Sequence, residues 1–231
     1  MLVLDRESWY TGDMYFKSRA AAGEVLAEQI AKKYRHTPCA VVALNDGAVV
    51  VAAQIALKLR CVLTMLLTDS IQLPREDTAI AGISQDGSFT YNNLYSPGEI
   101  DEFVSEYHGF IEQEKMNKLQ QMHKLEGPSG LIRRELLRNR TVILVSDGLM
   151  SGFSLDLAVE YTKTIQTNRI VVATPMASVK AVDRMHILAD EIYCLSVSED
   201  FISTDHYYEV QDVPSHDDVV KTVEEVVRHW K

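Results

Sequence analysis

The stretch Val142 to Ser154 reads VILVSDGLMSGFS and joins an apolar run to an acid and a glycine-containing turn. The apolar run Thr141 to Val145 predicts a strand covered on both faces, as in the parallel sheets of α/β proteins. A helix is expected from Leu155 to Thr164. Gly148 and Gly152 allow the backbone to approach a ligand closely, and N–H groups at the start of a helix suit phosphate. The stretch therefore predicts a strand, a phosphate-binding turn and a helix.

The rest of the chain alternates between expected strands and expected helices. The further strands are expected at Ala40 to Leu44, Val62 to Leu67, Ile170 to Ala173 and Glu191 to Leu195. The further helices are expected at Met14 to Tyr34, Ala48 to Leu59, Ile100 to Leu125, Leu131 to Arg138 and Val179 to Ile187, with a last one starting near His216. This alternation favours parallel pairing, and hence an α/β fold with a parallel sheet flanked by helices.

Closely spaced prolines and glycines leave room only for short elements in residues 68–98. Within them, Ile80 to Ser84 and Ser88 to Tyr91 are expected to form a hairpin. We expect a single domain over residues 1–231, in which residues 68–98 form a flap and residues 199–231 form a C-terminal hood and helix.

Composition limits the classes of partner. The chain has 231 residues and a net charge of −10, which opposes nonspecific binding to nucleic acid or to an anionic membrane, because both are polyanions. Three scattered cysteines do not form a disulfide framework or a metal motif, and no apolar run is long enough to span a bilayer. We therefore expect a cytoplasmic protein that captures any anionic ligand locally.

The segment Ser146 to Ser154 resembles the ribose-phosphate motif of the type I phosphoribosyltransferases. In that family two acids follow the strand and hold the ribose hydroxyls of phosphoribosyl pyrophosphate, and a small-Thr-Gly-small-Thr loop binds the 5-phosphate. Here Ser146 and Asp147 follow the strand, and Met150 to Ser154 form the loop. The hydroxyls and the glycine of the loop are kept, while two of its small residues are large.

The similarity runs through nearly the whole chain and is nearest to an uncharacterised bacterial phosphoribosyltransferase-like family. The stretches that carry it include Phe16 to Arg19 with Ala20 to Ala27, Ala40 to Leu59, Ala79 to Gly82, Arg140 to Ile143, Val171 to Pro175, Ala189 to Glu191, and Phe201 with Tyr207 and Tyr208. The resemblance implies a phosphoribosyltransferase-like sheet core with a small flap or hood subdomain.

The resemblance also implies which residues bind the ligand. Asp147 is the candidate catalytic residue, and the expected ribose and phosphate ligands are Ser146, Asp147, Gly148, Ser151, Gly152 and Ser154. An alternative role for Asp147 is that of an acid that stabilises the first N–H groups of the helix. Phe153 has either a packing or a base-stacking role, and His206, Tyr207 and Tyr208 either stack on a base or pack the tail.

Ligands of open parallel sheets bind beyond the carboxyl ends of the strands, where we expect loops to begin near Asn45, Thr68, Ser146 and Thr174. Asn45, Asp46, Gly47 and Ala48 stand where the family has its pyrophosphate loop. Asp46 replaces a cation there and would repel pyrophosphate unless a metal bridged them, so a plain turn is the alternative. Cations in the segment before the strand Thr141 to Val145, where type I enzymes carry a mobile loop over the active site, offer compensation; the alternative is a solvated helix face. They are Lys115, Lys118, Lys124, Arg133 and Arg134.

Two functions remain open at this point. The first is an active transferase that displaces pyrophosphate from phosphoribosyl pyrophosphate with an unknown nitrogen acceptor, in nucleotide metabolism and with Mg²⁺ as the implied metal. The second is a catalytically degenerate module, or pseudoenzyme, that binds a nucleotide or sugar phosphate. A third possibility is a purely structural dimer with the helix Ile100 to Leu125 as its interface. No metal ligands can be assigned from the sequence.

Overall fold

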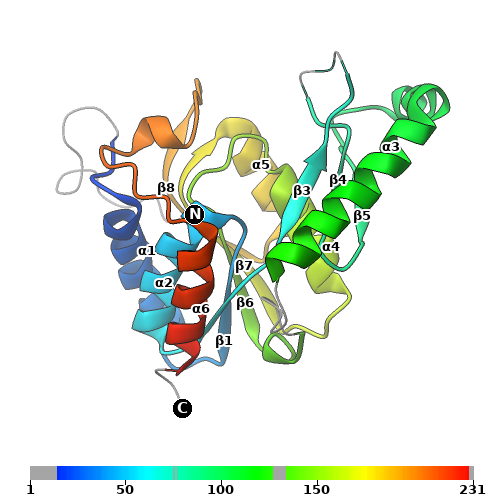
Figure 1. The fold of residues 1–231 in the computed structure, drawn as a ribbon. Coiled ribbons are helices and arrows are strands. Elements are labelled where there is room, and N and C mark those ends of the chain that lie inside the picture. Colours follow the sequence, from blue (N-terminus) through cyan, green and yellow to red (C-terminus); the bar gives the residue numbers. More distant parts are fainter. Residues whose placement is uncertain (1–14, 75, 77, 127–133, 229–231) are drawn as a thin grey trace.

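A five-stranded parallel sheet forms the centre of the computed structural model, which describes residues 15–228 except 75, 77 and 127–133 (Figure 1). Its strand order is β2-β1-β6-β7-β8. The strands are β1 (Cys39–Ala43), β2 (Val62–Met65), β6 (Thr141–Val145), β7 (Arg169–Ser178) and β8 (Glu191–Ser198). Every neighbouring pair runs parallel, so the expected α/β fold with a parallel sheet is confirmed.

Helices cover both faces of the sheet. One face packs against α1 (Arg19–Tyr34), α2 (Asp46–Leu59) and α6 (His216–Arg228), and the other against α4 (Phe153–Lys163) and α5 (Val179–Leu188). In β1, Val41 packs with the first group of helices and Val42 with the second. Because successive side chains of a strand point to opposite faces, a strand covered on both sides must be apolar throughout.

A smaller antiparallel sheet lies beside the main one, with the order β3-β4-β5 (Figure 1). Its strands are β3 (Thr68–Ile71), β4 (Ala81–Ser84) and β5 (Phe89–Tyr91), and the long helix α3 (Pro97–Glu126) packs on it around Ile111. The expected hairpin is present. Phe153 and Leu157 of α4 press against Gly82, where an added Cβ would lie 2.6 Å from Leu157 Cδ1 and 3.0 Å from Phe153 Cε1. Phe153 therefore has the packing role.

Several predicted helix starts are wrong, and for α1 and α2 capping residues explain the difference. α1 begins at Arg19, where the Ser18 hydroxyl accepts a hydrogen bond from the N–H of Ala21 at 3.1 Å. α2 begins two residues earlier than Ala48. Of the predicted helix Leu131 to Arg138, residues 131–133 lie outside the described part and Arg134–Leu136 form one turn of 3₁₀-helix (η1). The remaining corrections are shifts of a few residues: α3 begins at Pro97 instead of Ile100, and α4 begins at Phe153 instead of Leu155.

Two predicted loops are also wrong. Thr68 begins β3, because β2 ends at Met65 and the backbone of Leu67 pairs with the backbone and side chain of Gln85. No loop begins at Thr174, because β7 continues to Ser178 and stays paired with β8, which itself continues to Ser198. In the described residues, no helix is long and apolar enough to cross a membrane.

Candidate functional site

The turns that follow β1 and β6 lie side by side at the carboxyl edge of the sheet. The two strands are neighbours, and the N–H of Leu44 donates to the carbonyl of Val145 at 3.0 Å. The structure therefore brings Asn45 to Ala48 together with the end of β6 and Asp147, while Gly152 lies against Arg184 of α5. Part of the expected site is formed by these two segments.

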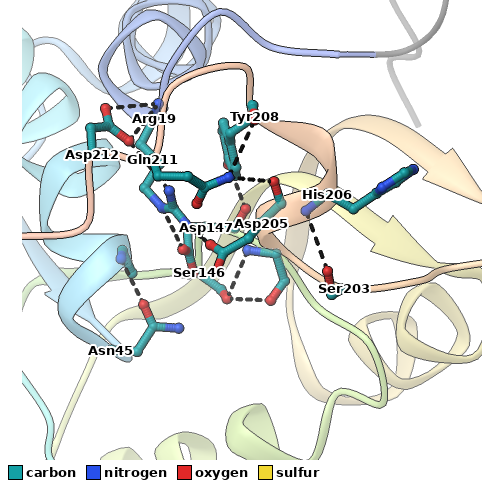
Figure 2. A network of polar contacts seen from close by, with 12 residues as sticks. Arg19, Asn45, Ser146, Asp147, Ser203, Asp205, His206, Tyr208, Gln211 and Asp212 are labelled. Atoms are coloured by element: carbon teal, nitrogen blue, oxygen red, sulfur yellow. Dashed lines mark hydrogen bonds and ion pairs between the residues drawn. The ribbon is translucent and has the colours of Figure 1, made fainter.

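Asp147 is held by a buried arginine that comes from the opposite end of the chain. The side chain of Arg19, the first residue of α1, has 1% of its surface exposed, and that of Asp147 has 6%. Nε of Arg19 donates to Oδ2 of Asp147 at 2.8 Å (Figure 2). Burying two charges is costly, and only close pairing in good geometry offsets that cost. The pair therefore fixes the carboxylate at the end of β6.

The other carboxylate oxygen of Asp147 is not satisfied. Oδ1 is buried and has no hydrogen-bond partner among the residues that the structure describes. Leaving a buried acceptor unpaired costs about 1–3 kcal/mol, and more when it is charged, so such groups are rare and call for an explanation. A donor from a bound ligand, such as a hydroxyl, would satisfy Oδ1.

Arg19 also binds two acids of the segment that follows β8. Its Nη1 lies 3.3 Å from Oδ1 of Asp212, its Nη2 pairs with Asp205, and its backbone N–H donates to Oδ2 of Asp212 at 3.2 Å (Figure 2). Burial lowers the pKa of Arg19, but the bonds to Asp147 and Asp205 outweigh this and raise that pKa above its usual value. One permanent cation is thus shared by three carboxylates.

Tyr208 completes the support of Asp147. Its ring lies against the guanidinium of Arg19, and Cζ of Arg19 is 4.5 Å from the centroid of the Tyr208 ring. The Tyr208 hydroxyl donates to the main-chain carbonyl of Asp147 at 2.6 Å. Burial, followed by the charge of Asp147, raises the pKa of the Tyr208 hydroxyl well above its usual range. The hydroxyl therefore remains a donor at all ordinary pH values.

Residues 199–212, which we call the covering segment, lie over the end of β6. Thr204 sits directly on Gly148: a Cβ added to this glycine would lie 2.8 Å from both Cγ2 and Oγ1 of Thr204. The covering segment is also tied to the residues before α1, because Phe16 N donates to the carbonyl of Tyr207 at 2.8 Å. Tyr207 and Tyr208 are both buried in this arrangement.

The loop from Gly148 to Ser154 leads into the N-terminus of α4. Gly152 is the N-cap residue, with φ of 74°, and offers no side chain to the helix. Ser151 is exposed and its Oγ accepts from the N–H of Phe153 at 3.3 Å, while Ser154 is half-buried in the first turn. Ser146 is 2% exposed, and its hydroxyl donates to the carbonyl of Gly148 at 2.9 Å. A helix N-terminus presents N–H groups to an anion; here the Ser151 hydroxyl occupies that of Phe153, and the N-cap residue Gly152 adds no side chain.

The expected pyrophosphate loop forms the first turn of α2 and is not a free turn. The Asn45 side chain caps the helix by accepting from the N–H of Ala48 at 2.7 Å. Asp46 faces His216 of α6, with 3.2 Å between Oδ1 and Nδ1. Gly47 faces the site: an added Cβ would lie 2.2 Å from Oδ2 of Asp147 and 2.9 Å from Nε of Arg19. Only a glycine fits beside this ion pair.

The proposed compensating cations that the structure describes interact largely with the small sheet and α3. Lys118 pairs with Asp69 at 3.0 Å, Lys115 lies over the ring of Phe89, and Arg134 pairs with Asp86 at 2.7 Å. Arg133 lies outside the described residues.

The described chain shows no group of three or more His, Cys, Asp or Glu side chains arranged to hold a metal ion. Burial raises the pKa of the Cys39 thiol to about 11 and those of Cys61 and Cys194 to about 12, so these thiols are not nucleophiles near neutral pH.

Sequence reasoning missed Arg19, Asp205 and Asp212. Arg19 belongs to a stretch that carries the family resemblance, but an arginine at the start of an alanine-rich helix looks like a solvated charge. Its partners lie 128 to 193 residues away in the chain, and no local pattern joins them. Tyr208 was expected in the hood, but its bond to the backbone of Asp147 could not be predicted.

Comparison with known proteins places this geometry in a family. The family model described as the phosphoribosyl transferase domain matches residues 12–216. The chain belongs to this family. It is also similar to a Mycobacterium tuberculosis protein with the provisional name phosphoribosyl transferase, represented in two strains, with 25% identity over 222 residues. The match covers 93% of this chain and 48% of that protein, so the chain spans about half the length of these curated relatives.

A solved structure agrees with this assignment at the level of the fold. The crystal structure of TT1426 from Thermus thermophilus is similar with a TM-score of 0.69 and 26% sequence identity. The similarity covers 91% of this phosphoribosyl transferase domain and 98% of TT1426. The expected family and the fold that it implies are therefore confirmed.

Proposed function

We propose that the protein binds a ribose 5-phosphate moiety at Asp147 and the loop Gly148 to Ser154, and that phosphoribosyl pyrophosphate is the source of this moiety. The observation that carries the proposal is the buried Oδ1 of Asp147, which has no partner among the described residues and lies at the start of the loop that leads into α4. A sugar phosphate brings a hydroxyl donor and an anion on one molecule. It therefore supplies both a donor to Oδ1 of Asp147 and an anion to the loop before α4.

As a transferase, the protein would act chiefly by positioning and electrostatics. The bond between C1 of the ribose and the pyrophosphate oxygen breaks, pyrophosphate leaves with the electron pair, and a nitrogen acceptor forms the new bond and loses a proton. Asp147 would hold the ribose hydroxyls, and the N–H groups around Gly152 and Ser154 would hold the 5-phosphate. Mg²⁺ would supply charge neutralisation on the ligand's own phosphates, because this metal is usually bound through substrate phosphates with few protein ligands.

A second candidate, binding without transfer, is favoured by the charges beside α2. Where a pyrophosphate would lie against the first turn of α2, the guanidinium of Arg19 is already shared by Asp147, Asp205 and Asp212. An uncompensated polyanion would be repelled there. A nucleoside monophosphate or a sugar phosphate avoids this repulsion, since its only anionic group lies at the loop before α4.

Calorimetric titration separates these candidates. We expect phosphoribosyl pyrophosphate with Mg²⁺ to bind tightly, ribose 5-phosphate to bind more weakly, and Asp147→Ala to lose roughly tenfold or more of the affinity for both. Asp101→Ala, at an exposed position on α3, is the matched control and should bind as the unchanged protein does. Equal affinity for both ligands would favour binding without transfer. Absence of binding by either ligand would refute the site.

A further inference from the structure

The two carboxylate oxygens of Asp147 differ in their hydrogen bonding, and an ordinary buried ion pair does not require such a difference. Oδ2 receives Nε–H of Arg19, while Oδ1 receives nothing from the described residues. Arg19 has further donors, but they bind Asp205 and Asp212 instead of the second oxygen. The guanidinium therefore makes a one-sided contact with Asp147 and does not form the two parallel bonds that arginine often makes with a carboxylate.

We propose that Arg19 is the positioning residue of the site, and that the turn at Thr204 and Asp205 is a cover that competes with the ligand. Arg19 holds Oδ2 so that Oδ1 is directed to a hydroxyl of the bound ribose. The turn shields Oδ1 until the ligand displaces it. This inference rests on the proposed function and assigns roles to residues outside the phosphate loop.

Contacts from α1 and α2 fix the carboxylate, and Tyr208 of the covering segment fixes the backbone that carries it. The Asp147 side chain has a broad torsional preference, so contacts must select its orientation. Nε of Arg19 supplies one contact from α1, and the backbone of Gly47 supplies a second from α2. Tyr208 supplies the third by donating to the main-chain carbonyl of Asp147 at 2.6 Å. Together they leave Oδ1 as the available acceptor.

The cover is the weakest part of this arrangement. Of the three acids that bind Arg19, Asp205 is the most open to solvent, with a side chain that is 61% exposed against 6% for Asp147 and 24% for Asp212. The turn is one short 3₁₀-helix (η2, Asp205–Tyr207), in which the N–H of Tyr207 donates to the carbonyl of Thr204 at 3.2 Å. Thr204 occupies the space over Gly148. A ligand that enters beside Asp147 would therefore displace this turn before it displaced Arg19.

The two roles predict opposite effects for substitutions within one ion cluster. We would titrate ribose 5-phosphate and inorganic phosphate into each variant and compare the ratio of the two affinities. Arg19→Lys keeps a cation for Asp205 and Asp212 but cannot reproduce the directional Nε contact with Asp147, so it should lower the preference for ribose 5-phosphate about tenfold, with phosphate affinity unchanged. Asp205→Asn weakens the cover and should raise that preference about two- to fivefold, because more of the protein is competent to bind.

Matched variants keep the result interpretable if Arg19→Lys folds poorly. Tyr208→Phe keeps the ring against Arg19 but removes the donor to the main-chain carbonyl of Asp147, and it should also lower the preference. Arg134→Met removes an arginine that likewise pairs with an acid, Asp86, and lies over a tyrosine ring, that of Tyr161, and it should leave the preference unchanged.

Four results would overturn the inference. Arg19→Lys and Tyr208→Phe proteins that fold and keep the full preference would exclude a positioning role. Equal losses for phosphate and ribose 5-phosphate in every cluster variant, Asp205→Asn included, would show a structural role alone. If the unchanged protein bound inorganic phosphate but showed no preference for ribose 5-phosphate, the inference would fail while the phosphate loop stood; binding of neither ligand would refute the proposed function as well.

Discussion

Gly47 shows how closely single residues are adapted to the site. It is the second residue of α2, where alanine is ordinarily the better helix former by about 0.5–1 kcal/mol. Its missing side chain is what lets α2 approach the ion pair of Arg19 and Asp147, because a Cβ would lie 2.2 Å from the Asp147 carboxylate. The backbone of Gly47 has no positive φ that would require glycine, so close approach is the reason for this residue.

Gly47→Ala should therefore disturb the site. We expect the substitution to displace the Asp147 carboxylate, lower the free energy of unfolding by about 1–3 kcal/mol, and weaken binding of ribose 5-phosphate. Gly109→Ala is the control, because this helical glycine of α3 has no atom within 4 Å of an added Cβ and should gain stability. Urea unfolding and calorimetry would measure both effects. A Gly47→Ala protein as stable as the Gly109→Ala protein would show that the site is looser than described.

At the scale of elements, the position of Asn45 at the N-terminus of α2 gives this residue a capping role. Its side chain caps α2 at 2.7 Å from the N–H of Ala48, so the residue has a structural role whether or not pyrophosphate binds nearby. Asn45→Ala should lower the free energy of unfolding by about 1 kcal/mol, whereas Asn45→Ser should keep the cap and the stability. Thermal unfolding would test this. If Asn45→Ser kept stability but lost binding of phosphoribosyl pyrophosphate, Asn45 would also be a ligand contact.

The elements could be predicted from sequence as far as periodicity and length determine them. The strand Thr141 to Val145 was placed correctly, because a strand buried on both faces is apolar throughout and Ser146 ends the run. The length of β7 was not predicted correctly, because Thr174, Pro175 and Ser178 are residues typical of loops. Thr174 and Ser178 bond to main-chain carbonyls of Met176 and Met150, which lets polar residues remain buried in a long strand. Such compensation depends on the tertiary structure.

The candidate site was predictable in part for the same reason. Asp147 and the loop after it follow one another in the sequence, so a motif can reveal them. The support of Asp147 comes from Arg19, Gly47 and Tyr208, which meet only after α1, α2 and the covering segment have packed. The charges of the individual residues in the sequence also gave an incomplete prediction of how the site would treat pyrophosphate. It identified Asp46 as a repulsive group, whereas the folded protein turns Asp46 toward His216.

At the scale of the whole molecule, α1 connects the site with the opposite end of the sheet. Its first residue, Arg19, binds Asp147 and the covering segment at the carboxyl edge. Its last residues, Lys33 and Tyr34, bind Glu191 at the start of β8, with 2.7 Å from the Tyr34 hydroxyl to Oε2 of Glu191. Because parallel strands share one direction, the start of β8 lies at the edge that faces away from Asp147. The two ends of α1 should therefore be separable, one for binding and one for stability.

Glu191 provides the test of this separation. Burial raises the pKa of its carboxyl, but hydrogen bonds from Lys33, Tyr193 and Tyr34 outweigh this and lower the pKa to about 2. A carboxyl with a lowered pKa in the folded state stabilises the protein above its unfolded-state pKa, and this stabilisation is lost as the pH falls toward 2. Glu191→Gln should thus lower the free energy of unfolding by about 1–2 kcal/mol at neutral pH, and by less at about pH 3.5.

Urea unfolding at both pH values would measure the difference, with Glu28→Gln as the control. Glu28 pairs with Lys58, but its side chain is 66% exposed, so its loss should change stability by less than about 0.5 kcal/mol at either pH. The affinity of Glu191→Gln for ribose 5-phosphate should equal that of the unchanged protein. A loss of affinity in a folded Glu191→Gln protein would mean that α1 transmits a change between its ends, and that Arg19 is positioned by the far edge of the sheet as well as by its three acids.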